Sequence, residues 1–577
     1  MLHRTILVSL YCHMEKNWKI LKAPPSEDVD GLAKAININP YLATLLIQRG
    51  IADYSLALKF FRMSLDHLHD PFLMQDMNIA VERLAKAIDS EEKILIYGDY
   101  DVDGTTSVTM MVSYLKEHTT HIDFYIPDRY SEGYGVSEDG INWAVEHKIN
   151  LIISLDCGIK AHKMVDLAAS NNIDFIVCDH HTPDKVLPAA TAVLDPKRKD
   201  CDYPYEELSG CGVGFKLLQG LTKHKNWDDA DLWPLLDLVA VSIAADIVPI
   251  TGENRVLCFF GLKILNKTPR SGLAALIEVG NLQKPLTVTR TVFGIAPRIN
   301  AAGRIAHAHG AVDLMLSRDY EEALYLAGQV NSKNEIRKET ELEIVNEAIE
   351  MIDAQTIVKN TTVLYKEDWH KGVIGIVASK CIEHFHRPTI ILTQSNGKAT
   401  GSARSVKGFD IHEAIGACSE LLEQFGGHKY AAGLTMKQEN VEPFQLMFEQ
   451  VVSATILEEQ LTPTITIDEE IDLSIISASY LSIIDQMEPF GPGNLKPVFI
   501  SRNLKASKSK LLKELHLKTS VFNEEDGVVI DAIGFNMPEY YEKLRSDPYF
   551  DMAYTIEENN FRGRTTIQLH IKDIKFL

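Results

Sequence analysis

The chain has 577 residues, 45% of them hydrophobic and 24% charged, a composition that is ordinary for globular protein but too long for a single core. Acidic residues outnumber basic ones by 80 to 58, and the net charge of −22 argues against a surface that coats nucleic acid or anionic lipid as a whole, while a local basic channel remains compatible with it. The eight cysteines form no C-x-x-C pair and no apolar run reaches the 18 or so residues of a membrane helix, which predicts a reduced, cytoplasmic protein.

Residues 1–75 are expected to form an N-terminal cap segment, because they contain short apolar clusters and no recognisable chemistry. A small apolar patch near the start is not followed by a cleavage site, so we reject a signal peptide. Met14 is expected to be the more natural start of the chain.

Residues 93–107, KILIYGDYDVDGTTS, are the stretch around which the rest is organised. Its apolar run predicts a buried strand that leads into a loop with Asp99, Asp101 and Asp103. Three carboxylates within five residues repel one another, and burial increases that cost, so we expect a divalent cation among them. Taken alone, the motif is more often a solvated acidic turn.

The same succession of apolar strand, polar end and helix recurs along the next hundred residues. Runs at 151–155, 175–178 and 192–194 are followed by acids or imidazoles: Asp156, then Asp179, His180 and His181, then Asp195. Strands that alternate with helices imply a mostly parallel sheet, and ligands bind beyond the carboxyl ends of such strands. Four strands that bring these side chains to one edge predict a site there.

An apolar run of helical character at 235–245 ends at Asp246. An aspartate among apolar residues is rarely left unpaired when it is buried. This run is therefore either a fifth segment that contributes to the site, through Asp246, or a helix whose terminal Asp246 bonds its own backbone, and this segment favours neither.

Residues 271–355 are expected to be a connecting segment with a long helix, which begins near residue 310. A second α/β domain follows at 356–455, with glycine-punctuated segments GSARS (401–405) and FGGHKYAAG (425–433). Glycine allows the backbone to approach a ligand, and Ser, Arg and His donate hydrogen bonds to phosphate, although the second segment is as consistent with a turn.

Residues 460–577 have β-rich periodicity and the most basic window, 502–518, which suits a small oligonucleotide-binding (OB) barrel or a solvated basic hairpin.

Four motifs stand in the order and approximate spacing of the DHH phosphoesterase superfamily, and the chain resembles that family: D-x-D-x-D-G-x-x-S at 99–107, LDCG at 155–158, DHH at 179–181 and AD at 245–246. APRINAAGR (296–304), the two glycine-punctuated segments and EPFGPGN (488–494) narrow the resemblance to bacterial single-strand-specific 5′→3′ DNA exonucleases. The resemblance implies an α/β protein with a parallel-sheet DHH core at 76–270, a DHH-associated domain and a terminal OB-type barrel.

The resemblance also implies a site. Two divalent cations, Mn²⁺ or Mg²⁺, would be held by five residues, with Asp156 as the bridge: Asp101, Asp103, Asp156, His180 and Asp246. Asp99 would support the first loop, and His181 would face the scissile phosphate. Contacts to DNA are expected from seven more residues: Arg298, Asn300, Arg304, Ser402, Arg404, Ser405 and His428. The implied partners are single-stranded DNA, single-strand-binding protein and a RecQ-type helicase, in DNA recombination and repair.

Three other functional hypotheses compete with the exonuclease. A haloacid-dehalogenase-type phosphatase would use Asp101 as a nucleophile, but it leaves residues 179–181 without a role. A DHH-type phosphodiesterase of short oligonucleotides or cyclic dinucleotides is normally shorter and lacks the barrel. A strand-binding module with an inactive metal site conflicts with the intact set of acids and histidines.

Overall fold

The computed structural model describes residues 14–577 apart from 306, 356, 526, 547 and 562. The stretch before Met14, on which the expected start depends, lies outside the described residues. The chain divides into two compact units. The first unit contains Ser55–Arg337 together with Met487–Lys496, and the second unit contains the chain up to Tyr54, Lys338–Gln486 and Pro497–Leu577. The division therefore falls inside the predicted N-terminal cap, and ten residues of the predicted terminal domain pack with the first unit.

The first unit is built on a parallel sheet of five strands in the order β3-β2-β4-β5-β6. These strands are β2 (Ile94–Gly98), β3 (Ile122–Tyr125), β4 (Leu151–Leu155), β5 (Asp174–Cys178) and β6 (Ala192–Leu194). β2, β4 and β6 are buried along their whole length, which explains their largely apolar sequences. The predicted parallel sheet is confirmed, with edge strand β3 as an addition that its short, mixed sequence had not revealed.

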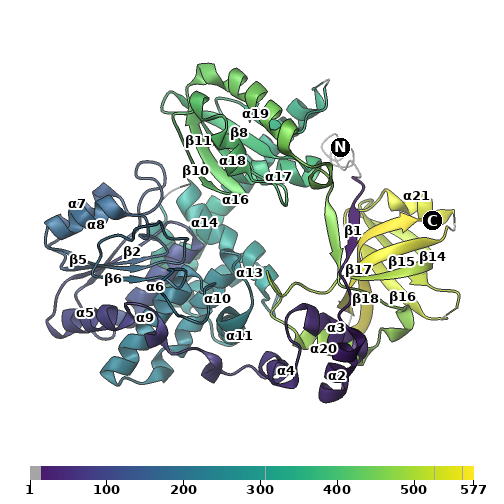
Figure 1. Ribbon diagram of the computed structural model, residues 1–577, viewed down its shortest axis with the longest axis horizontal. Helices are drawn as coiled ribbons and strands as arrows, with labels where there is room; N and C mark the ends of the chain where they lie inside the picture. Colours follow the sequence, from purple (N-terminus) through teal and green to yellow (C-terminus); the bar gives the residue numbers. More distant parts are fainter. Residues whose placement is uncertain (1–13, 306, 356, 526, 547, 562) are drawn as a thin grey trace. The chain divides into compact units, whose positions relative to one another are not determined.

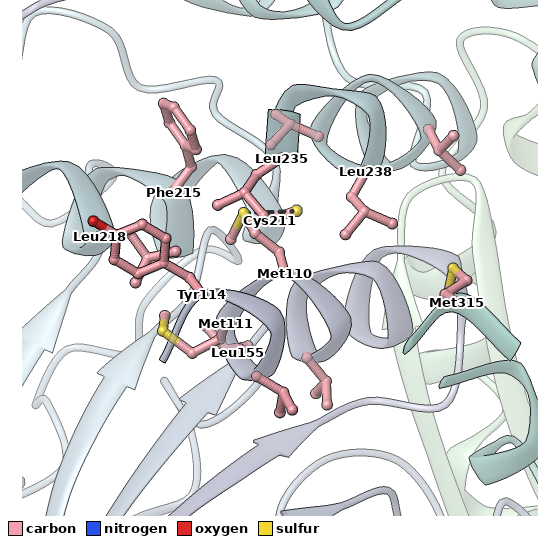
Figure 2. Packing of buried hydrophobic residues seen from close by; sticks show 14 of the residues in the cluster. Met110, Met111, Tyr114, Leu155, Cys211, Phe215, Leu218, Leu235, Leu238 and Met315 are labelled. Atoms are coloured by element: carbon pink, nitrogen blue, oxygen red, sulfur yellow. Dashed lines mark hydrogen bonds between the residues drawn. The ribbon is translucent and has the colours of Figure 1, made fainter. Parts of the chain in front are cut away.

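Helices cover both faces of this sheet (Figure 1). On one face lie α6 (Val102–Leu115), α9 (Gly210–Lys225) and α10 (Leu236–Ala245), and on the other lie α7 (Glu138–Glu146) and α8 (His162–Ser170). Figure 2 shows side chains of α6 between the sheet and the neighbouring helices, with Met110 and Met111 among them. Because α6 is buried on almost every side, its first turn is held rigidly.

The remaining helices of the first unit are α4 (Tyr54–Phe61), which begins at the division, α5 (Met77–Asp89), α11 (Gly252–Lys267), α12 (Ser271–Val279), α13 (Val288–Gly294), α14 (Ala296–Ile305) and α15 (His309–Leu316). The long helix α16 (Tyr320–Asp353) follows and crosses from the first unit to the second. The continuous helix predicted from about residue 310 is interrupted at residues 317–319, where the chain turns between α15 and α16. No helix among the described residues combines the length and apolarity needed to cross a membrane.

The second unit contains a mixed sheet of five strands in the order β10-β11-β9-β8-β7. Its strands are β7 (Thr362–Tyr365), β8 (Thr389–Ser395), β9 (Lys398–Arg404), β10 (Gln424–His428) and β11 (Ala431–Met436), accompanied by α17 (Ile374–Phe385), α18 (Ile411–Gly416) and α19 (Val441–Thr455). The N-terminal part of the chain adds two helices to this unit, α2 (Ser26–Ile36) and α3 (Pro40–Gln48). It also adds the strand β1 (Asn17–Ile20), which pairs in parallel with β12 (Thr464–Ile467).

A closed barrel completes the second unit (Figure 1, yellow). Its strands are β14 (Phe499–Leu512), β15 (His516–Phe522), β16 (Val529–Gly534), β17 (Phe550–Phe561) and β18 (Arg564–Phe576), with β13 (Glu469–Glu470), α20 (Ala478–Gln486) and α21 (Tyr540–Arg545) nearby in the sequence. Pairing of β14 with both β15 and β17 closes the barrel and leaves none of the five strands as an open edge. The predicted OB-type barrel is confirmed.

Candidate active site

Two aspartates of the first motif are placed by the start of α6. Asp101 caps this helix, and its Oδ1 accepts a hydrogen bond from the Gly104 amide at 3.0 Å. Asp103 lies inside the first turn rather than in the loop where the sequence had suggested it. Asp99 is buried just after β2, and its Oδ1 accepts the Gly135 amide at 3.4 Å.

The side chain of Asp103 is fixed by donors from α9 and α10, in addition to a longer bond of 3.4 Å from the Ser107 hydroxyl on its own helix. Its Oδ2 accepts the Gly210 amide at 2.7 Å, and its Oδ1 accepts the Cys211 amide at 2.8 Å and the Ser242 hydroxyl at 2.7 Å. Both amides belong to the first turn of α9, where the helix dipole favours a negative charge. A Cβ at Gly210 would lie 2.6 Å from the Cβ of Asp156, so only glycine allows this approach.

His180 lies at the centre of the acidic cluster. Its Nε2 is 3.2 Å from Oδ1 of Asp156, 3.6 Å from Oδ2 of Asp246 and 3.9 Å from Oδ2 of Asp103. Burial lowers the pKa of His180, which favours the neutral imidazole that a metal requires. Asp246 ends α10, and its carboxylate lies in the cluster with Asp103 and His180.

The cluster has the properties of a cation site. Several buried atoms lack a hydrogen-bond partner among the described residues, namely Oδ2 of Asp99, Oδ1 of Asp156 and both ring nitrogens of His180. Burial, and then the charge of neighbouring carboxylates, raises the pKa of four acids: Asp99, Asp101, Asp156 and Asp246. Hard carboxylate oxygens with one imidazole suit Mg²⁺ or Mn²⁺, so the residues fit a divalent cation.

His181 is held in a different way. Its Nδ1 lies 2.7 Å from Oδ1 of Asp179, whose Oδ2 accepts the Ile159 amide at 2.9 Å. Burial by itself would lower the pKa of His181, but the Asp179 carboxylate outweighs it and raises that pKa to about 9. Burial would likewise raise the pKa of Asp179, yet its bonds to His181 and to backbone lower it to about 2. The imidazole of His181 is therefore protonated and positively charged at neutral pH.

Tyr134 is a member of the site that the sequence did not single out. Its hydroxyl lies 3.2 Å from Nε2 of His181 and donates to the Asp156 carbonyl at 3.2 Å. Burial raises the pKa of Tyr134, so the hydroxyl stays protonated. The glycines on either side, Gly133 and Gly135, both have positive φ. Two glycines around a tyrosine were the feature of the sequence that could have drawn attention to this loop.

In the second unit, two predicted residues lie together at the start of α17. Ser402 and Arg404 alternate on β9 and so share a face, and the Arg404 guanidinium donates to the Ser402 hydroxyl at 3.0 Å. A Cβ at Gly375, in the first turn of α17, would lie 2.9 Å from each of these side chains. A helix N-terminus, an arginine and a hydroxyl form a set that suits a phosphate.

The other predicted contacts are more scattered. Ser405 donates its hydroxyl to the Phe409 carbonyl at 2.9 Å, and His428 is exposed on β10. Asn300 and Arg304 are half-buried on α14. Arg298 is only 7% exposed, and its guanidinium donates to Asn331 at 2.8 Å and to the Gly294 carbonyl at 2.5 Å. These bonds tie α14 to α16 and α13, and contact of Arg298 with DNA stays a prediction.

The parallel sheet with this acidic and histidine cluster at its carboxyl edge defines a DHH phosphoesterase. The model of the DHH family N-terminal domain matches residues 93–243, that of the DHHA1 domain matches 355–454, and that of the RecJ OB domain matches 467–573. The chain belongs to the RecJ family.

Relatives of this family align over most of the chain. The single-stranded-DNA-specific exonuclease RecJ of Bacillus subtilis is 36% identical over 561 residues, which cover 96% of this chain and 70% of that protein. The Escherichia coli RecJ is 32% identical over 516 residues, which cover 86% and 89% of the two chains. The crystal structure of Thermus thermophilus RecJ in complex with Mn²⁺ superposes with a TM-score of 0.84 at 26% identity, over 97% of this chain and 79% of that one.

Proposed function

We propose that this protein is a metal-dependent exonuclease that hydrolyses phosphodiester bonds of single-stranded DNA from the 5′ end. The observation that carries the proposal is the buried cluster around His180, whose unsatisfied carboxylate and imidazole atoms fit divalent cations. Its relatives are named single-stranded-DNA-specific exonucleases, and their alignment with this chain supports the same substrate.

Two divalent cations, Mn²⁺ or Mg²⁺, are proposed for the cluster. Five residues would hold them, with Asp156 between the two: Asp101, Asp103, Asp156, His180 and Asp246. A bound pair of this kind supplies activation of a water molecule and neutralises charge on the leaving oxygen of a phosphodiester. The backbone and hydroxyl donors on Asp103 orient that ligand before a cation arrives.

His181 is proposed to bind the scissile phosphate. As an imidazolium it donates Nε2–H to a non-bridging phosphate oxygen, while Asp179 keeps the proton on Nδ1 and fixes the ring. Tyr134 holds the same Nε2 in the free protein and would share it with the phosphate or release it. Asp99, bound to the Gly135 amide, would connect the first loop with the Tyr134 loop.

The second unit would bind the strand through phosphate contacts. Ser402 and Arg404, at the N-terminus of α17, are proposed to receive the 5′-terminal phosphate, with further contacts from Ser405, directly after β9, and from His428 on β10. In the first unit, Asn300 and Arg304 of α14 are proposed to contact the strand as well.

The barrel offers a basic surface for the same strand. Within the basic window, Arg502, Lys505 and Lys518 are engaged with acids, at 2.7–3.9 Å. Three exposed lysines, Lys508, Lys510 and Lys513, make no ion pair with a described residue. We therefore propose these lysines as phosphate contacts.

The cellular setting is also a proposal. Membership of this family supports a role in DNA recombination and repair in the cytoplasm, together with single-strand-binding protein and a RecQ-type helicase. A pull-down with each purified partner, with and without single-stranded DNA, tests these two interactions.

The central test is the digestion of oligonucleotides labelled at either end, single- or double-stranded, with Mn²⁺, Mg²⁺ or EDTA. We expect release of label from the 5′ end of single strands only, and no product in EDTA. Cleavage restricted to dinucleotides or cyclic dinucleotides would favour the shorter DHH phosphodiesterases instead. Full activity of a folded Asp156→Ala variant would exclude the proposed site.

A further inference from the structure

The motif at residues 488–494, EPFGPGN, has no role in the function described so far. It lies in the sequence between α20 and the barrel, yet Met487–Lys496 packs with the first unit. Its contacts are made with residues 249–255, which follow Asp246 in the chain. We propose that Met487–Lys496 is a positioning element for Asp246 and thereby for the cations of the proposed active site.

Asp246 depends on the backbone that follows it. It closes α10, and the next residue, Ile247, has φ +59°, a conformation that is costly for a β-branched side chain. Such a conformation persists only where the surroundings hold it. The described structure therefore needs contacts that fix residues 247–251.

One side of this loop is held by its own domain. The Pro249 carbonyl accepts hydrogen bonds from the Tyr205 hydroxyl at 3.2 Å and from the Asn254 amide at 3.1 Å. The other side is held by the motif, since the Ile250 amide donates to the Pro492 carbonyl at 2.7 Å. Ile250 is fully buried, so this amide would be costly to leave without a partner.

The motif fits this loop closely. A Cβ at Gly491 would lie 2.5 Å from Cγ1 of Ile250, and one at Gly493 would lie 2.9 Å from Cγ2 of Thr251. Asn494 is 3% exposed and donates to the carbonyls of Met487 and Pro489, both at 2.9 Å, which closes the motif into a compact turn. The two glycines are thus required by close approach to the loop.

Arg255 fastens the motif from α11. Its Nη1 donates to the carbonyls of Met487 at 2.8 Å and Pro489 at 3.3 Å, and its guanidinium lies 3.8 Å from the centre of the Phe60 ring. Arg255 is only 4% exposed. A buried guanidinium loses much of its solvation, so these carbonyls make the docked position of the motif strongly preferred.

The test is the variant Gly491→Ala, whose new methyl group would push against Ile250. This inference rests on the proposed metal site, so the first measurement is Mn²⁺ binding to the metal-free protein by titration calorimetry. We expect Mn²⁺ affinity to fall about tenfold, the lower end of the range for residues that orient a ligand. At saturating Mn²⁺ the KM for a single-stranded oligonucleotide should stay unchanged.

A second variant separates positioning from general damage. Ile250→Ala removes every side-chain atom beyond the Cβ, so that of the three atoms nearest to the Gly491→Ala methyl only the Cβ, at 3.6 Å, would remain. The double variant should therefore regain Mn²⁺ affinity relative to Gly491→Ala alone. Gly328→Ala, on the exposed side of α16 with no atom within 4 Å of the new methyl, is the matched control. If Gly491→Ala does not fold, Asn494→Ala serves in the same assay.

The outcomes are distinct. Unchanged Mn²⁺ affinity in a folded Gly491→Ala protein, or a loss that the double variant does not restore, would overturn the positioning role. If the unsubstituted protein binds Mn²⁺ normally but does not digest single-stranded DNA, the proposed function is contradicted. The positioning role is decided separately, by the calorimetry of the variants.

Discussion

Nε2 of His180 lies 3.2 Å from Oδ1 of Asp156, and neither atom has a hydrogen-bond partner among the described residues. Around this pair, burial and charge raise the pKa of Asp156 well above its usual value. Polar atoms that are buried without a partner destabilise the fold, because they lose their hydration. A bound cation would offset this loss by compensating the negative charge.

Asp156→Asn should therefore have opposite effects on stability and activity. Without cations, removal of one negative charge should raise the apparent Tm. With Mn²⁺ at about 100 times its Kd, the unsubstituted protein should gain about 2.7 kcal/mol and the variant much less. Exonuclease activity should fall by roughly 100-fold or more. Thermal denaturation with EDTA or Mn²⁺ measures this, with Asp123→Asn on the exposed face of edge strand β3 as control.

Ser242→Ala tests the support of a proposed ligand. The Ser242 hydroxyl donates to Oδ1 of Asp103 at 2.7 Å from α10, on the same helix that Asp246 ends. Its loss should weaken Mn²⁺ binding about 10–100-fold, as for other groups that orient a metal ligand. Ser242→Thr keeps the hydroxyl and should recover part of the affinity, whereas Ser170→Ala, exposed at the end of α8, should change nothing. An Mn²⁺ titration of Ser242→Ala that overlays the unsubstituted protein would contradict this role.

Asp195 gives a prediction on pH. It is fully buried after β6, and burial raises its pKa from 3.8 to about 7. Because the pKa of Asp195 is higher in the folded than in the unfolded protein, its charged form destabilises the fold. This loss of stability is absent below about pH 4, grows as the pH rises to 7 and is constant above that. Asp195→Asn removes it, so the variant should gain stability relative to the unsubstituted protein between pH 5 and 7.5.

The size of that gain is at most about 4 kcal/mol at neutral pH. The measurement is the apparent Tm of both proteins from pH 5 to 8 with saturating Mn²⁺, which keeps the metal site constant. A difference in Tm that does not change with pH would show that the Asp195 carboxyl does not titrate in this range.

Arg404→Ala should reduce discrimination between 5′-phosphorylated and 5′-hydroxyl single strands. The Arg404 guanidinium and the Ser402 hydroxyl lie at the start of α17, where a phosphate would accept several hydrogen bonds. Loss of one charged hydrogen bond should cost about 1.5–3 kcal/mol in binding of the phosphorylated strand. Arg404→Lys should recover only part of this, because lysine lacks the two-pronged geometry. Binding titrations of both strands in EDTA provide the measurement, and equal losses for both would place the phosphate elsewhere.

The barrel lysines should control the salt dependence of binding. Each phosphate contact on a single strand contributes about 0.7 to the slope of log K against log salt. Combined replacement of Lys508, Lys510 and Lys513 by alanine should therefore reduce that slope by about 2, if each contacts one phosphate. Arg502→Ala is the control, since Arg502 is already paired with Glu470 and Asp551. A slope unchanged by the triple replacement would leave these lysines as solvated surface.

Much of the first unit was readable from sequence because its signals are local. The runs that form β2, β4 and β6 are apolar apart from Ser154, as expected for strands buried on both faces, and the acids follow them directly. The motif order then indicated which of these residues share a site. Edge strand β3 gave no such signal, since only one of its four residues is buried and its pattern is short.

The partners of each site residue were not readable, because they come from distant parts of the chain. Ser242 and the amides of Gly210 and Cys211 reach Asp103 only once α9 and α10 pack on α6. The bond of Arg298 to Asn331 likewise depends on the packing of α16, which the residues around Arg298 in the sequence do not reveal.

The sequence by itself determined the class of chemistry: hard oxygen ligands and imidazoles placed after buried strands, in the order of one family. Only the tertiary structure decided which oxygens are left unsatisfied around His180, and that the turn at Gly491–Asn494 lies against the loop after Asp246. The reason is physical: strand and helix patterns depend on near neighbours in the chain, whereas burial and hydrogen-bond partners are set by packing between segments hundreds of residues apart.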